Sequence, residues 1–141
     1  MTPIITRVAS ILQLAYSTML VATGTAGIVT ARWELSTVFG IDLSAWPHDI
    51  QATMLGQYRF LKSVELGAGI FCIAYRKSIM GGDRAAAVFL AILFIGVSAR
   101  TLAWIVDGRP AAAFIAFLVL EALVFVAVAL HLRLNNGSQP A

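Results

Sequence analysis

The stretch YRFLKSVELGAGIFCIAY, residues 58–75, decides how this chain folds. Its second half is as apolar as hydrocarbon, whereas its first half carries Arg59, Lys62 and Glu65. The uncharged run from Leu66 to Tyr75 makes only about 15 Å of helix, half the thickness of a bilayer core. Beginning at Tyr58 lengthens the helix to about 18 residues, which is just enough to span. Either this helix does not cross a membrane, or three charges enter the membrane with it.

The composition of the chain indicates that it lies in a membrane. Of 141 residues, 60% are hydrophobic and 12% are charged, and the mean hydropathy is +0.86. A soluble domain of this size needs more charge on its surface, and so short a chain cannot enclose this much apolar material in one core. We therefore expect an integral membrane protein.

Three further segments are apolar over the roughly 20 residues that a spanning helix needs. They cover residues 8–29, 85–106 and 111–132. Short connections with turn residues make consecutive helices antiparallel neighbours. The prediction is an all-α, four-helix up-down bundle forming a single transmembrane domain over 1–141, its second helix covering 58–75 or beginning near Asp49. We expect the first segment to be a retained helix, because its apolar run is too long for a signal peptide.

Charges in short loops predict the orientation, since Lys and Arg favour the cytoplasmic side. One side carries more of them than the other, which places both termini in the cytoplasm. The richer side holds Arg7, Arg76, Lys77, Arg84 and Arg133, and the other holds Arg32 and Arg109. Three tryptophans, Trp33, Trp46 and Trp104, then fall near the outer interface.

Three helices place ionisable groups in the outer half of the bilayer. Glu65 and Arg100 lie about 10 Å from the outer side, and Glu121 about 15 Å. A charge facing lipid costs at least about 2.5–3.5 kcal/mol, so these groups should turn inward and pair. We expect Lys62 to pair with Glu65, and Arg100 with Glu121. The predicted ligand-binding site comprises Arg59, Lys62, Glu65, Trp104, Arg100, Phe117 and Glu121, with Glu121 as the catalytic candidate.

A purely structural interpretation of these residues remains open. Intramembrane pairs can join helices, and long basic side chains can reach the headgroups. The phenyl stripe around Glu121 is more often plain packing, and five glycines are expected to allow close helix contacts: Gly24, Gly27, Gly67, Gly69 and Gly96. Cys72 is read as a packing residue. His48 and His131 fall at opposite membrane faces, so we expect no metal site, and no cofactor motif is present.

The chain also resembles a known family. The residues that carry the resemblance are Tyr58-Arg59-Phe60, the glycines at 67 and 69, Arg100 ahead of Asp107-Gly108 and Pro110, and Glu121. In these residues the chain is similar to a family of small bacterial four-helix membrane proteins with a domain of unknown function. Lys62 departs from that pattern. The resemblance implies the fold and a multi-pass location in the bacterial inner (plasma) membrane, and no activity.

Three functions remain in competition. The first is binding or carrying a membrane lipid or other amphiphile, since one positive charge is left over and aromatic residues line the site. The second is an intramembrane acid/base enzyme, an isomerase or cyclase, using Glu121. The third is an accessory subunit or assembly factor of a larger membrane complex. A homo-oligomer is the other assembly that we expect, and recovery of the protein only in that form would argue against the third function. Nucleic-acid binding is not expected, because the basic residues form no stripe.

Overall fold

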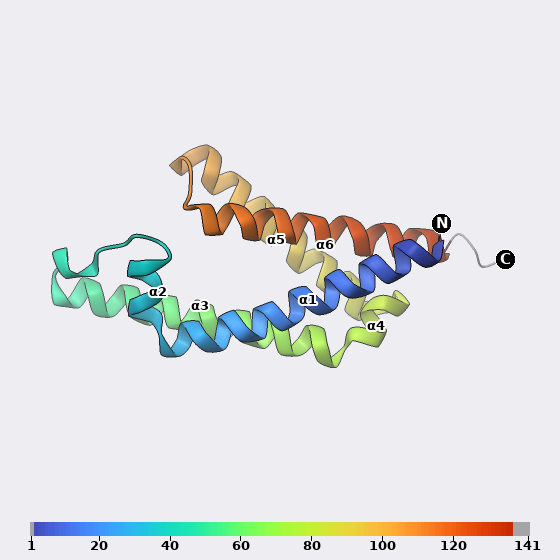
Figure 1. Ribbon diagram of the computed structural model, residues 1–141, viewed down its shortest axis with the longest axis horizontal. Helices are drawn as coiled ribbons and strands as arrows, with labels where there is room; N and C mark the ends of the chain where they lie inside the picture. The colour runs from blue at the N-terminus through green and yellow to red at the C-terminus, as the bar shows by residue number, and fades with distance from the viewer. Residues whose placement is uncertain (1, 137–141) are drawn as a thin grey trace. The chain divides into compact units, whose positions relative to one another are not determined.

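The structure, a computed structural model, describes residues 2–136, and every regular element in that range is helical. This confirms the predicted all-α class. The elements are α1 (Thr2–Val29), α2 (Ala31–Thr37), the 3₁₀ helix η1 (Leu43–Ala45), α3 (His48–Ala74), α4 (Arg76–Gly81), α5 (Arg84–Asp107) and α6 (Ala112–Asn136) (Figure 1).

Three of these helices are long and apolar enough to cross a membrane. They are Pro3–Val29 within α1, all of α5, and residues 112–135 of α6, with mean hydropathies of 1.5, 2.1 and 2.8. The protein is therefore a helical membrane protein. Among the described residues α3 does not meet the same test, although it has 27 residues. The reason lies in the stretch quoted first, since α3 carries Arg59, Lys62 and Glu65 within its apolar sequence.

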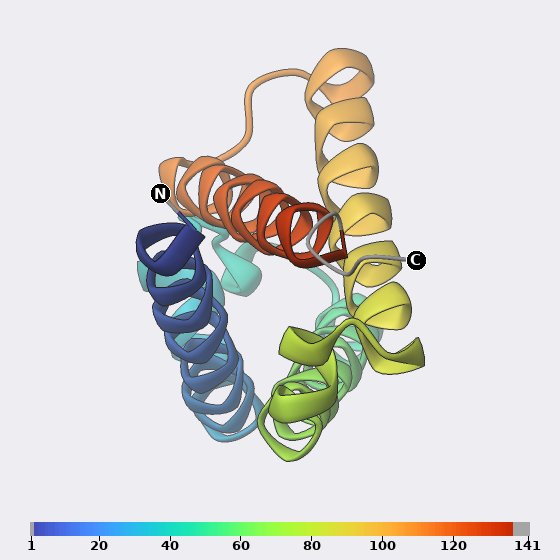
Figure 2. The same cartoon turned by 90° about the vertical axis from the view of Figure 1, so that its right-hand side faces the viewer.

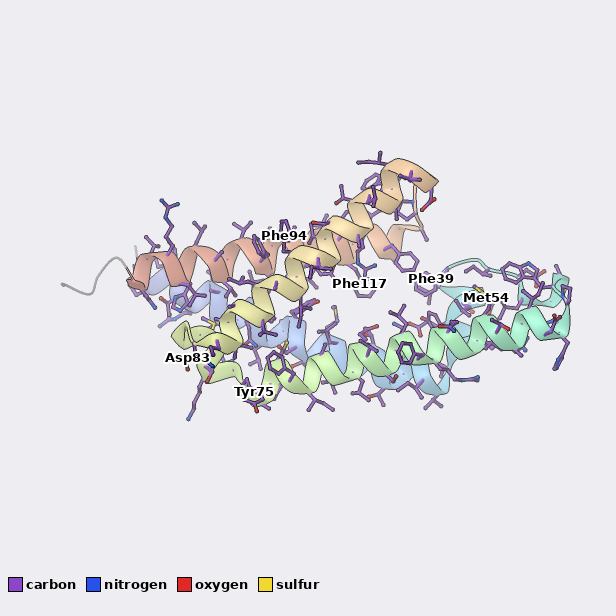
Figure 3. All side chains as sticks on the ribbon, turned by 180° about the vertical axis from the view of Figure 1, so that it is seen from behind. Phe39, Met54, Tyr75, Asp83, Phe94 and Phe117 are labelled. Carbon is purple, nitrogen blue, oxygen red and sulfur yellow. The ribbon has the colours of Figure 1, made fainter. Side chains whose placement is uncertain are left out.

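The structure has more helices than the four predicted spans, because two connections fold into short helices. The connection after the first span holds α2 and η1, and α3 begins at His48, next to Asp49. The connection after α3 holds α4, whose C-cap is Gly82 with a φ of +85°, a conformation that favours glycine. Tyr75 and Asp83, labelled in Figure 3, flank α4.

The described residues form two compact units. The second unit is Ser17–Phe71, which contains the C-terminal part of α1, then α2, η1 and most of α3. The first unit contains α1 up to Tyr16 and the described chain from Cys72 onward.

In the second unit, α1 and α3 run antiparallel with their backbones in contact at glycines. A Cβ atom on Gly24 would lie 2.6 Å from the backbone N of Leu66, and one on Gly69 would lie 2.8 Å from the backbone N of Val21. The predicted close contacts are confirmed at these positions. The prediction is wrong for Gly67, where a Cβ atom would have no neighbouring atom within 4 Å. Gly67 faces away from α1 because it lies two residues from Gly69 on the helix.

A small apolar cluster joins α2, η1 and the start of α3. Its buried members are Ala31, Leu35, Leu43 and Leu55, with Phe39, Ile41, Met54 and Tyr58 packed against them; Phe39 and Met54 are labelled in Figure 3. Asp42 caps η1 by accepting a hydrogen bond from the backbone N–H of Ser44 at 2.9 Å. Hydrogen bonds from Ser44 hold the pKa of the Asp42 carboxyl below its usual range.

In the first unit, α5 and α6 are antiparallel and cross, with the Phe94 and Phe125 rings 6.3 Å apart. Figures 1 and 2 show the two helices separating toward the turn that joins them. At the other end of α6, the His131 Nε2 donates to the backbone O of Met80 at 3.0 Å. That tautomer leaves Nδ1 to accept from the Thr6 hydroxyl at 3.1 Å, so His131 connects α1, the end of α4 and α6.

We predict that Gly24→Ala and Gly69→Ala each destabilise the protein by about 1–3 kcal/mol, because the added methyl group must push the α1 and α3 backbones apart. Gly67→Ala is the matched control on α3, and it should stabilise by up to about 1 kcal/mol through helix propensity. Thermal unfolding in detergent measures all three. Equal effects at positions 67 and 69 would contradict the observed packing.

Candidate functional site

Arg100 of α5 and Glu121 of α6 form a direct ion pair. The Arg100 Nε donates to Glu121 Oε2 at 3.1 Å. Glu121 is only 7% exposed, and its other oxygen accepts a hydrogen bond from the Tyr16 hydroxyl at 3.4 Å. The predicted pair is confirmed. It forms because consecutive antiparallel helices place residues at similar distances from their shared turn side by side.

Two phenyl rings accompany the arginine of this pair. The Arg100 guanidinium carbon lies 5.7 Å from the centroid of the Phe114 ring and 5.9 Å from that of Phe117, within cation–π range. Figure 3 labels Phe117 on α6. The helical spacing predicts a stripe of phenyl rings beside Glu121, and in the structure two rings of that stripe also lie against the guanidinium paired with it.

A cavity of about 370 Å³ lies between α5 and α6, next to the turn that joins them. We call it the turn cavity; its wall is formed by Arg100, Ala103, Trp104, Asp107, Gly108, Arg109, Pro110, Phe114 and Leu118. Among the described residues, Arg100 donates hydrogen bonds to Glu121 alone, and its side chain is 35% exposed. Its two Nη groups are therefore open to a ligand. A guanidinium offers paired N–H groups that match a carboxylate or phosphate.

The other predicted charges gather in the second unit, around Lys62. The Lys62 Nζ lies 3.0 Å from Glu65 Oε2 and 3.4 Å from Glu34 Oε1. It also lies 5.5 Å from the centre of the Tyr58 ring. Lys62 is 5% exposed, so the structure buries a lysine between two carboxylates. We call Glu34, Lys62 and Glu65 the lysine cluster. The predicted pairing of Lys62 with Glu65 is confirmed.

Sequence reasoning missed three members of these surroundings. Glu34 comes from α2, in a connection expected to lie outside the helices. The Thr23 hydroxyl hydrogen-bonds Glu65 Oε1. In the first unit, Tyr16 contacts Glu121. The leftover positive charge was the available signal, because a buried lysine needs acidic partners and Glu34 is the nearest acid after the first span.

Arg59 and Trp104 complete the predicted set. Arg59 is exposed, and its Nε donates to the backbone O of Ile28 at 3.2 Å, so it does not join the lysine cluster. Trp104 lines the turn cavity. Apart from Arg59, the predicted residues divide between the Arg100–Glu121 pair with its cavity in the first unit and the lysine cluster in the second. Cys72 is buried, and residues 2–136 contain no group of three metal-binding side chains.

We predict that breaking the Arg100–Glu121 pair costs more than replacing it. Arg100→Leu should destabilise by about 3–5 kcal/mol, because Glu121 is left buried and unpaired, and adding Glu121→Leu should recover much of that loss. Thermal unfolding in detergent of both single variants and the double variant gives the coupling energy. Losses that simply add would contradict a direct interaction.

Lys62 should be the most sensitive position in the lysine cluster. Lys62→Met leaves two carboxylates facing each other, so we expect a loss of about 3–5 kcal/mol, while Lys62→Met with Glu34→Gln and Glu65→Gln should regain much of it. Arg59→Met serves as the control on the same helix and should change stability little, because Arg59 is exposed. Equal losses for the two methionine variants would show that burial of Lys62 is unimportant.

Comparison with known proteins agrees with the family resemblance. No curated protein and no solved structure matches the chain. One family does match, over residues 4–132, which include the Arg100–Glu121 pair, the turn cavity and the lysine cluster. The chain belongs to this family, described as a domain of unknown function (DUF4345).

Proposed function

We propose that the protein is a multi-pass membrane protein that binds or carries an amphiphile with an anionic head group, and that the turn cavity holds the head group. The observation that carries the proposal is Arg100, whose Nη groups are open in a cavity otherwise lined largely by aromatic and aliphatic side chains. Ligand sites combine such walls with a few placed polar groups.

The position of the turn cavity suits an amphiphile. The turn between α5 and α6 joins two candidate membrane spans, so it lies at a membrane face. Arg100 lies seven residues before Asp107, about 10 Å below that face. The cavity therefore extends from headgroup level into the hydrocarbon.

For topology we propose a four-helix bundle in the bacterial inner (plasma) membrane, with α3 as the fourth crossing helix and both termini in the cytoplasm. The lysine cluster supports it, because pairing neutralises charges that would otherwise prevent α3 from crossing. In the first unit, Thr6, Met80 and His131 meet. The basic residues Arg7, Arg84 and Arg133 lie within four residues of that meeting point, at the end away from Arg109.

Catalysis by Glu121 is the less supported alternative. A general acid or base must reach its substrate, whereas Glu121 is 7% exposed and is bonded to Arg100 and Tyr16. Arg100, rather than Glu121, lines the turn cavity. The geometry therefore favours Glu121 as a positioning residue for Arg100.

The test is lipid retention measured by native mass spectrometry of protein released from nanodiscs. Arg100→Gln with Glu121→Gln removes both charges, so neither is left unpaired, and it should lower retention of an anionic lipid at least about tenfold, the value of one charge-assisted hydrogen-bond pair. Arg133→Gln removes an exposed charge near the other end of α6 and should retain lipid as the native chain does. Equal retention by the double variant and the native chain would refute the proposal.

A further inference from the structure

Two oppositely charged side chains at the turn cavity have no partner in the part of the chain that the structure describes. Asp107 and Arg109 both line the cavity, yet among residues 2–136 neither forms a salt bridge or a side-chain hydrogen bond. They are two residues apart, so a pair between them would need little chain movement. Leaving both unpaired keeps an acceptor and a donor available at one site.

Gly108 maintains this separation. Its φ of +95° and ψ of −172° lie in a region that is essentially restricted to glycine. The backbone therefore leaves the helix abruptly after Asp107, which ends α5, while Arg109 stands in the turn. No atom lies within 4 Å of where a Cβ of Gly108 would be, so glycine is needed here for conformation and not for space.

The two helix ends beside the turn cavity are electrostatically opposite. The C-terminal end of α5 carries partial negative charge, and Asp107 adds a full one. The N-terminal end of α6 carries partial positive charge, and Arg109 and Arg100 add to it. The cavity thus has a negative side and a positive side.

The negative side also has an aromatic wall. Arg100, Trp104 and Asp107 are spaced by four and three residues, so they share one face of α5. A tryptophan face next to a carboxylate attracts an ammonium group, by cation–π attraction and by ion pairing. The guanidinium at the far end of the same face attracts an anion.

From this arrangement we infer that the head group is zwitterionic, with an anionic phosphate or carboxylate at Arg100 and Arg109 and an ammonium at Asp107 and Trp104. This inference rests on the proposed function and names its ligand class. The walls contributed by Ala103, Phe114 and Leu118 continue the cavity with apolar surface. They suit the chain of a lipid better than a free soluble zwitterion.

The experiment is a competition in nanodiscs that contain equal parts of phosphatidylethanolamine, which bears an ammonium, and phosphatidylglycerol, which does not. Native mass spectrometry of the full chain should show phosphatidylethanolamine retained about tenfold over phosphatidylglycerol. Asp107→Asn should abolish that preference while phosphatidylglycerol stays bound. Asp83→Asn, at the exposed N-cap of α5, is the matched control and should keep the preference.

The outcomes separate the inference from the proposed function. Equal retention of the two lipids by the native chain, with loss of both in the Arg100→Gln, Glu121→Gln variant, would overturn the zwitterion and leave amphiphile binding standing. If that double variant retains both lipids as well as the native chain does, amphiphile binding itself would be overturned. Displacement of lipid by free phosphoethanolamine at equal concentration would overturn the lipid source of the head group.

Discussion

Burial of ionised groups in apolar surroundings is the constraint on which the rest of this structure depends. Each charge inside a helical membrane protein needs a partner, and the choice of partner determines which helices must lie together. Glu121 requires α5 beside α6 through Arg100, and Lys62 requires α2 beside α3 through Glu34. In a membrane, where hydrophobic burial does not draw helices together, such pairs and close backbone contacts determine the packing.

The Arg100–Glu121 pair was predictable because its geometry depends on two quantities readable from sequence. Helix rise gives the depth of each residue, and a four-residue turn makes the helices neighbours. Within the lysine cluster, only the pairing of Lys62 with Glu65 could be predicted, because both residues lie on the same helix. Glu34 could not be placed in advance, since its position depends on α2 packing Ala31 and Leu35 into a small apolar cluster. A helix of seven residues is too short for hydrophobic periodicity to predict that packing.

The phenyl rings and the glycines show where spacing alone misleads. A stripe at helical spacing identifies a shared face but not the contacts that it makes with another helix, so the contacts of Phe114 and Phe117 with Arg100 were not predicted. Gly67 and Gly69 have the same chemistry, yet only Gly69 contacts α1, because the rotation of α3 about its axis is decided by all of its contacts together. The turn cavity likewise arises from the divergence of α5 and α6, which periodicity does not describe.

Gly27 of α1 lies against the lysine cluster, so the size of the residue at position 27 limits which side chains the cluster can contain. A Cβ at this position would lie 2.5 Å from the Lys62 Cδ and 2.7 Å from Glu34 Oε2. Because Gly27 of α1 has no Cβ, the aliphatic part of the buried Lys62 side chain of α3 can occupy the space beside it. Positions 27 and 62 therefore cannot vary independently: among relatives, a larger residue at 27 should accompany a shorter one at 62, and the carboxylates at 34 and 65 should then become neutral as well. Gly27 and the lysine cluster therefore form one unit whose members must change together, spread over three helices.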